Sequence, residues 1–301
     1  MLAFYSVLPW KVFRHRLGRA IARDNIFGRS AELAYFFLFS VFPLLLFLST
    51  LLGMISGGER IEQDLLRYFK TVMPLAAYRL VASTLKEVTK TSGGGKLSAG
   101  ILISLAIASS GMVAIIEGLN TAYAVREARS WWKRRLVAGI LTLAMAVFTI
   151  LALTIMLYGN VLGQWIAGNL GLGAAFRRLW PFVQWPLTLA FALVAFTVVY
   201  RYAPNLHEQK WHWIIPGASV ALVLWLLESL GLRVYLRFFD TSDATYGSLG
   251  ALMVLMMWLY LFGIAILIGG AVNSIIEQAA ARAGDPDAKL PGEKTPGELR
   301  S

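Results

Sequence analysis

The chain has 301 residues, of which 57% are hydrophobic and only 15% are charged, and it carries 28 Lys and Arg against 17 Asp and Glu. Soluble proteins carry roughly a quarter charged residues. This composition, with a mean hydropathy of +0.63, therefore excludes a soluble globular enzyme, a disordered chain and a fibrous protein. The absence of cysteine also excludes a disulfide framework, a zinc ribbon and a cysteine nucleophile.

Residues 1–32 predict a basic amphipathic helix at the membrane interface. At about 100° per residue, Phe13 and Leu17 share one face of this helix, whereas Lys11 and Arg19 share the opposite face. Such a helix can lie in the interface plane, or it can pack on the other helices as an ordinary surface helix. The segment lacks the short apolar core and the small-residue cleavage site of a signal peptide.

Six apolar stretches predict an all-α, polytopic membrane domain over residues 33–277. Each stretch is long enough to cross a hydrocarbon layer of about 30 Å, which takes roughly 20 helical residues. The strict alternation over about 10 residues that marks membrane β-strands does not occur. The expected spans are 33–55, 97–116, 136–158, 182–202, 214–237 and 249–272.

Residues 56–96 form the expected outer loop between the first two spans. Two stretches of this loop follow helical spacing, and Pro74 separates them at a position that suits the first turn of the second helix. We therefore expect two amphipathic helices that cover the outer mouth. At the other end of the chain, residues 278–301 are predicted to form a disordered cytoplasmic tail, because Pro, Gly and charged residues dominate from Gly284 onward.

The basic residues predict the orientation of the chain in the membrane. Two loops of equal length can be compared: residues 117–135 hold five Lys and Arg, whereas residues 163–181 hold two. Both termini are therefore predicted to be cytoplasmic, together with the 117–135 loop. Membrane topology also accounts for the net charge of +11, so we expect membrane lipids as partners and no nucleic acid.

Hydrolytic chemistry has few residues to support it. The three histidines are His15, His207 and His212, whereas a metal or nuclease site needs several His and carboxylate groups at ligand spacing. The sequence holds no G-x-S-x-G, Walker A or H-E-x-x-H motif. We therefore expect no enzymatic activity, no catalytic residue, no metal and no cofactor.

Glu228 is the leading candidate for a functional residue, because an ionisable group inside a membrane span costs about 2.5–3.5 kcal/mol. No basic residue stands three or four positions away, so Glu228 is expected to be protonated, to reach a cavity or to pair with another helix. It acts either in proton, cation or headgroup binding or as a structural hydrogen bond between helices. Arg233 and Arg237 either snorkel to the outer surface or hold a phosphate or carboxylate.

The segment between the last two spans adds Asp243 and Tyr246 to the candidate cavity residues. This segment forms either a re-entrant element that lines a cavity or a plain tight turn. In the first span, Pro43 removes a backbone hydrogen bond and is expected to kink the helix as a hinge. In the second span, small residues at every fourth position predict close helix packing. They are Ala106, Ser110, Ala114 and Gly118.

Five stretches of the chain resemble the YihY/BrkB family of bacterial inner-membrane proteins, and the likeness extends from about residue 10 to residue 277. Their order and spacing together are specific, although none of them is a catalytic fingerprint. The stretches are AELAYFFLFSVFPLLLFLS (31–49), EGLNTAYAVREARSWWKRR (117–135), YRYAPN (200–205), IIPGASVALVLWLLES (214–229) and ATYGSLGALMVLMMWLY (244–260).

This resemblance implies six spans and a place in the bacterial inner membrane. Some members of the family have carried a tRNA-processing ribonuclease label and others a virulence or serum-resistance label, and some relatives are linked to lipid or lipopolysaccharide export. The resemblance also implies a motif on the cytoplasmic side. Its residues in this chain are Glu117, Asn120, Tyr123, Glu127 and Arg129.

Two functions are consistent with these features. The leading hypothesis is a transporter or flippase-like protein for a lipid or another amphiphilic or anionic envelope molecule, and it requires a cavity that reaches Glu228. The alternative is a non-transporting membrane scaffold or envelope-integrity factor, which can form a homo-oligomer through small-residue faces. The alternative predicts a solid helix bundle in which Glu228→Gln has no effect.

Overall fold

The structure is a computed structural model of the chain. It describes residues 9–53, 97–169, 173–206, 209–238, 247–285 and 288–290, together with six single positions between 63 and 83. Side chains at 41–53, 97–104 and a few other helical positions lie outside the description. The predicted outer loop at 56–96 and the end of the predicted tail therefore fall almost entirely outside the described residues.

The described part of the chain contains seven helices and no strand, as the predicted all-α class requires. Five of the helices contain a segment long and apolar enough to cross a membrane. The first expected span, 33–55, falls in a further long helix whose side chains are described only as far as residue 40, so the count of six spans stays a prediction. The helices are α2 (Trp10–Arg23), α3 (Ile26–Gly53), α6 (Leu97–Ala122), α7 (Trp131–Asn169), α8 (Gly173–Tyr202), α9 (Trp211–Phe238) and α11 (Gly247–Arg282).

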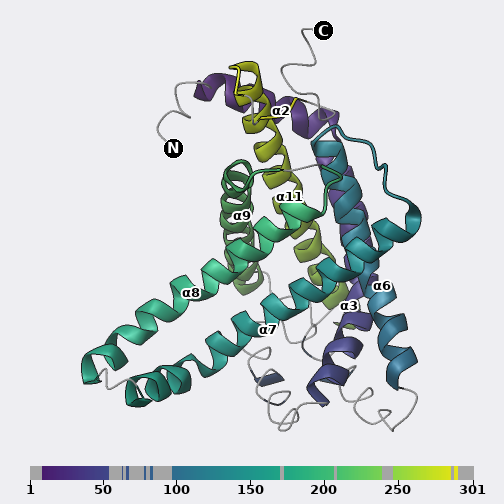
Figure 1. The fold of residues 1–301 in the computed structure, drawn as a ribbon. Coiled ribbons are helices and arrows are strands. Elements are labelled where there is room, and N and C mark those ends of the chain that lie inside the picture. Colours follow the sequence, from purple (N-terminus) through teal and green to yellow (C-terminus); the bar gives the residue numbers. More distant parts are fainter. Residues whose placement is uncertain are drawn as a thin grey trace.

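Helix α11 lies at the centre of the arrangement, in contact with α2, α3, α6 and α9. Helices α7 and α8 pair with each other and lean away from these helices as a long hairpin (Figure 1), with α7 also contacting α6 and α8 also contacting α9. Only 22% of the apolar segment of α7 and 17% of that of α8 are buried. The hairpin therefore presents most of its apolar surface outward.

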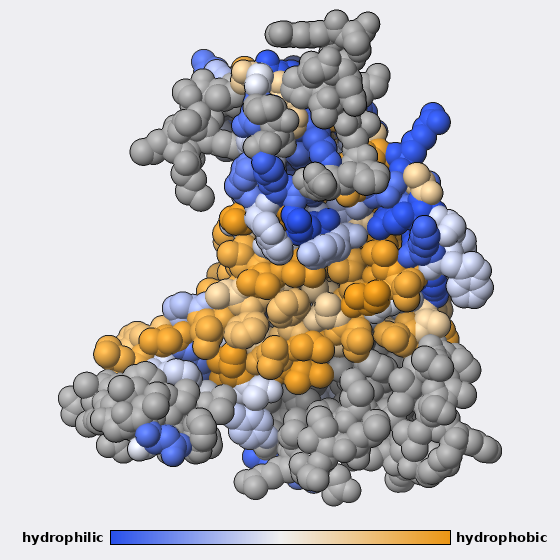
Figure 2. Space-filling view, in the orientation of Figure 1, coloured by the Kyte–Doolittle hydropathy of each residue, from blue (hydrophilic) through white to orange (hydrophobic). Residues whose placement is uncertain are grey.

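The face drawn in Figure 2 carries a broad apolar band, and polar side chains lie above it toward the end of the molecule where α2 is found. Exposed apolar side chains on α7, α8 and α9 contribute to the apolar surface. They include Leu136, Ile140, Phe182 and Leu227. A contiguous apolar surface of this extent is unusual for a soluble monomer. It is the surface that a lipid bilayer covers.

The best-buried part of the core lies toward the end of the molecule where α2 is found, which we call the α2 end. Leu33, Ile116, Leu119 and Leu267 are almost completely buried there. A Cβ atom on Gly118 would lie 2.6 Å from a methyl carbon of Leu267, so α6 and α11 pack with no room for a side chain at this position. The predicted small-residue stripe of the second span thus serves close packing at Gly118, whereas Ala106 is exposed.

Helix α2 lies across this end of the molecule (Figure 1). Phe13 and Leu17 pack against the core, and Ala20 is buried, whereas Lys11 and Arg19 are exposed. Trp10, which the amphipathic pattern also places on the apolar face, is 65% exposed, so a helix that lies in the membrane interface stays a prediction. Asn25, at φ 48°, forms the turn into α3, a backbone conformation that asparagine tolerates better than most residues.

Candidate functional site

The chain reverses direction directly after α6, and this reversal places the first group of candidate residues. Ala124 has a left-handed backbone at φ 55°. The N–H of Val125 donates to the Asn120 carbonyl at 2.9 Å, and the N–H of Ala124 donates to the Thr121 carbonyl at 2.9 Å. These two bonds form a Schellman motif, which satisfies the last carbonyls of a helix. The loop that follows, residues 123–130, returns along the end of α6.

Glu127 is the centre of this loop, held by four hydrogen bonds. Arg129 donates to the carboxylate through Nε and Nη2, each at 2.7 Å, and through its backbone N–H at 3.1 Å. Asn120 Nδ2 donates the fourth bond at 2.9 Å. Burial alone would raise the pKa of Glu127, but the bonds from Arg129 and Asn120 together hold this pKa below its ordinary value. Glu127 is thus an ionised anchor at neutral pH.

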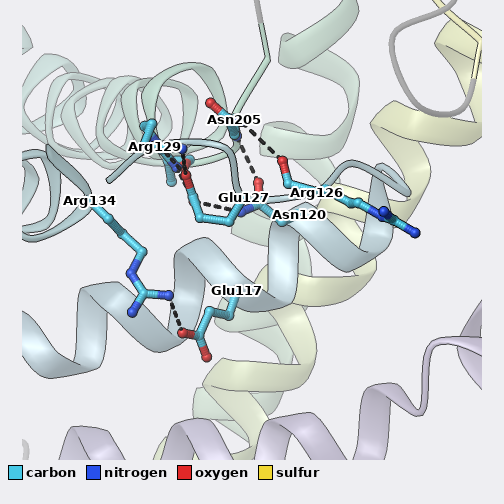
Figure 3. A network of polar contacts seen from close by, with 8 residues as sticks. Glu117, Asn120, Arg126, Glu127, Arg129, Arg134 and Asn205 are labelled. Atoms are coloured by element: carbon cyan, nitrogen blue, oxygen red, sulfur yellow. Dashed lines mark hydrogen bonds and ion pairs between the residues drawn. The ribbon is translucent and has the colours of Figure 1, made fainter. Parts of the chain in front are cut away.

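The same residues connect α6 to the chain that follows α8 (Figure 3). The backbone N–H of Asn205 donates to Asn120 Oδ1 at 2.7 Å, and Asn205 Nδ2 donates to the Arg126 carbonyl at 3.0 Å. Arg129 Nη2 donates to the Ala203 carbonyl at 2.8 Å. Three parts of the chain, α6, the 123–130 loop and residues 203–205, are therefore joined by polar contacts, of which those of Asn120 and Arg129 are half-buried and that of Asn205 Nδ2 is exposed.

Glu117 makes a separate contact to α7. Its Oε1 accepts from Arg134 Nη1 at 2.8 Å (Figure 3), and 44% of the Glu117 side chain is exposed. An exposed ion pair of this kind contributes up to about 1 kcal/mol. Of the five residues that the family resemblance implies, Asn120, Glu127 and Arg129 thus share one network, and Glu117 lies outside it.

Tyr123, the fifth of these residues, belongs to a second polar cluster deeper in the molecule. This inner cluster consists of Tyr123, Gln209, Asn273 and Glu277, each at most 5% exposed. Gln209 Nε2 donates to Glu277 Oε2 at 3.2 Å. Burial raises the pKa of Tyr123 above its ordinary value, and the charge of Glu277 adds to this effect. The side chains of Gln209 and Asn273 are within reach of the Tyr123 hydroxyl and act against this rise.

Asn273 and Glu277 were not identified as candidates from the sequence. The Asn273 Oδ1 accepts the backbone N–H of Gly217 at 2.6 Å and so joins α11 to α9. A Cβ atom on Gly217 would overlap the carbonyl oxygen of Gly269, so the two helix backbones touch at this point. The signal in the sequence is a pair of polar residues one helical turn apart, Asn273 and Glu277, at the end of a long apolar run.

Glu228 lies in the apolar segment of α9, Trp211–Tyr235. It is half-buried, and its Oε1 is buried with no hydrogen-bond partner among the residues that the structure describes. The neighbouring Ser229 Oγ accepts from Trp258 Nε1 at 3.3 Å, which ties this part of α9 to α11. The unpaired carboxyl oxygen therefore lies at the edge of a helix contact.

The remaining candidates are placed only in part. Arg233 is exposed on α9, whereas the side chain of Arg237 and the residues Asp243 and Tyr246 lie outside the described residues. Helix α3 runs through Pro43 without interruption, but that side chain is also outside the description, so its role as a hinge stays a prediction. Across the described ranges, no three His, Asp or Glu side chains gather as a metal site would require.

Comparison with known proteins gives one family. The family model described as Virulence factor BrkB matches residues 17–292. A ribonuclease-like protein named YfkH from Bacillus subtilis (strain 168) is 38% identical over 252 residues, which are 83% of this chain and 90% of that relative. No solved structure matches the chain.

Two further relatives carry the name UPF0761 membrane protein. The one from Stenotrophomonas maltophilia (strain R551-3) is 27% identical over 279 residues, which are 89% of this chain and 61% of the relative. The one from Xanthomonas oryzae pv. oryzae (strain PXO99A) is 25% identical over 270 residues, which are 87% of this chain and 60% of the relative. The chain therefore spans less than two thirds of the length of these two relatives.

Proposed function

This chain belongs to the Virulence factor BrkB family, and from that premise we propose that it is a flippase-like transporter in the bacterial inner membrane. Its substrate is a lipid or another amphiphilic, anionic envelope molecule. The proposal places both termini on the cytoplasmic side, as the basic residues predict. We propose no ribonuclease activity for this chain, because its three histidines and the absence of a nuclease motif in the sequence give that chemistry no support.

The observation that carries the proposal is the environment of Glu228. A carboxyl group inside an apolar membrane segment is costly, and the buried Oε1 of Glu228 has no partner among the described residues. A purely structural acid would be expected to have this oxygen satisfied by a hydrogen bond. The unpaired oxygen favours a role in which a proton or a polar part of the substrate occupies it for part of the transport cycle.

The surroundings of Glu228 on α9 support a path along the lipid-facing surface. Val223, Leu227 and Leu230 are all more than half exposed and share one face of the helix. Glu228 follows Leu227 directly and therefore lies at the edge of this apolar face. An amphiphilic substrate could keep its acyl chains on the apolar face while its polar part passes the carboxyl group.

The experiment is a lipid-translocation assay on the purified chain in proteoliposomes, with a fluorescent phosphatidylglycerol as the probe. We expect Glu228→Gln to lower the translocation rate about tenfold relative to wild type, since the loss of a charge-assisted contact is worth about 1.5–3 kcal/mol. Met253→Leu is the matched control, because Met253 is an exposed residue of α11 and the change keeps its volume and polarity. Equal rates for wild type, Glu228→Gln and protein-free vesicles would overturn the proposal.

A specific observation also favours the alternative, a non-transporting scaffold or envelope-integrity factor. Gly118 packs against Leu267, and Gly217 packs against Gly269, with no room for a side chain at either glycine, and such close packing of α6, α9 and α11 is typical of a solid helix bundle. In this alternative the exposed apolar faces of α7 and α8 serve lateral contacts, including those of a homo-oligomer. Wild-type protein would then move no lipid, and Glu228→Gln would leave envelope integrity unchanged in cells that depend on the chain.

A further inference from the structure

A second potential binding site lies at the α2 end, far from Glu228. An open hollow of about 450 Å³ separates the end of α8 from the start of α9, and its lining is basic and aromatic. Glu228 lies 17 residues along α9 from Trp211, which corresponds to about 26 Å of helix. The hollow is therefore separate from the proposed transport acid. Its lining residues are Arg201, Gln209, Lys210, Trp211 and His212.

Arg201 is the principal cation of this hollow, and its position is fixed on three sides. Its Nη1 donates to the backbone carbonyl of Gln209. Its guanidinium carbon lies 4.8 Å from the ring centroid of Trp211 and 5.6 Å from that of Tyr202. Its Nε finds no acceptor in the described part of the chain, and no ion pair to Arg201 is found there. A preorganised guanidinium that is not held by an acid in the described part of the chain matches the oxygens of a phosphate.

Gln209 fixes Arg201 from the inner side of the hollow. Its backbone carbonyl accepts from Arg201 Nη1, while its side chain is only 3% exposed and its Nε2 donates to Glu277 in the inner cluster. The Tyr123 hydroxyl is within reach of the same side chain. The side chain of Gln209 therefore belongs to the inner cluster, and the group that the hollow offers to a ligand is the guanidinium of Arg201.

The hollow also borders on the apolar surface. Trp211 is 47% exposed and Ile215, one turn further along α9, is 38% exposed, so an apolar strip leads away from the hollow along one face of the helix. The charged lining of the hollow thus borders directly on exposed apolar side chains of α9. Tryptophan is typical of the layer where lipid headgroups meet the hydrocarbon. Arginine side chains near helix ends reach into the same layer. A lipid can therefore place its headgroup in the hollow and its acyl chains along α9.

We infer that this hollow binds the headgroup of an anionic membrane lipid, with the phosphodiester on Arg201. A free phosphate ester shares the phosphate chemistry but lacks the acyl chains that would follow the strip formed by Trp211 and Ile215. The lipid is therefore the ligand that the surroundings favour. The inference does not rest on the transport function, since a bound lipid at this position stabilises the chain whether or not the chain moves lipid.

The test is a binding titration of the full-length chain in a neutral detergent, with dioleoyl-phosphatidylglycerol and dioleoyl-phosphatidylcholine as probes. Binding is followed by the shift in melting temperature and by native mass spectrometry. We expect phosphatidylglycerol to bind and Arg201→Gln to weaken this binding about tenfold. Arg201→Lys should lose less, because it keeps the charge but not the fork of N–H groups.

Arg126→Gln is the matched control, because it removes one exposed positive charge from the same end of the molecule without touching the hollow. Its affinity should equal that of wild type. The melting temperature of each variant without added lipid shows whether it is folded. Equal binding of the two lipids, equal losses in the variants of Arg201 and Arg126, or full displacement of the lipid by millimolar inorganic phosphate would each overturn the inference.

Discussion

Asn120 and Asn205 are 85 positions apart in sequence and meet through a 2.7 Å hydrogen bond, in which the backbone N–H of Asn205 donates to Asn120 Oδ1. Asn120 is buried, and its Nδ2 donates at the same time to Glu127. One amide thus satisfies a backbone donor beyond α8 and a carboxylate in the 123–130 loop. This bond holds the end of α6 against the connection between α8 and α9.

Substitution of Asn120 is expected to be costly. Asn120→Ala leaves the N–H of Asn205 without its acceptor and removes one bond to Glu127, so we expect a loss of about 1–3 kcal/mol in the free energy of unfolding. The measurement is thermal or denaturant unfolding of the purified protein in detergent. Glu117→Gln is the control, because it removes a half-exposed ion pair on the same helix and should cost less than about 1 kcal/mol. Equal losses in the two variants would contradict the role of Asn120.

The ion pair of Glu127 predicts a dependence of stability on pH. The pKa of Glu127 is lower in the folded protein than in the unfolded chain, so its contribution to stability is complete above the ordinary glutamate pKa of about 4.3 and is lost as the pH falls through the folded-state value. We expect the melting temperature of wild type to fall below about pH 4 more steeply than that of Glu127→Gln. The difference between the two proteins should thus be largest at neutral pH, and parallel pH profiles would refute this assignment.

The backbone contact between α9 and α11 predicts opposite effects for two glycines of one helix. Gly217→Ala puts a Cβ atom onto the Gly269 carbonyl and against Asn273, and overpacking of this kind costs about 1–3 kcal/mol. Gly231→Ala, further along α9, meets nothing within 4 Å and should be neutral or stabilising by up to about 1 kcal/mol. Unfolding in detergent measures both, and a Gly217→Ala protein as stable as wild type would show that the helices separate at this point.

The expected orientation can be tested by labelling, because the chain has no native cysteine. Ser130, in the loop after α6, and Gly168, near the end of α7, are both exposed. In intact cells a membrane-impermeant maleimide should label Gly168→Cys, and it should reach Ser130→Cys only after permeabilisation. Labelling of Ser130→Cys alone in intact cells would show that the orientation is the reverse of the predicted one. Equal labelling of both positions in intact cells would argue against an odd number of membrane crossings between them.

Hydropathy along the sequence was sufficient to predict the all-α class and the positions of the long apolar helices. The free-energy cost of placing a residue in hydrocarbon is local and adds along the chain. A stretch such as the apolar segment of α7 can therefore be recognised without knowing which helices pack against it. Helical periodicity also placed Phe13 and Leu17 on one face of α2, and both pack against the core. Glu228 could likewise be identified from its own surroundings in the sequence, as one acid in an apolar run.

The tertiary structure decided how the polar residues group. Glu117, Asn120, Tyr123, Glu127 and Arg129 are close in sequence, yet the turn at Ala124 sends the Tyr123 side chain into the inner cluster with Glu277 and leaves Glu127 in the loop network. The hollow at Arg201 and Trp211 likewise depends on the fold, because the chain between α8 and α9 brings the end of one helix beside the start of the next. The inner cluster depends on the pairing of helices distant in sequence, and packing and desolvation at such contacts have no counterpart in a local pattern of residues.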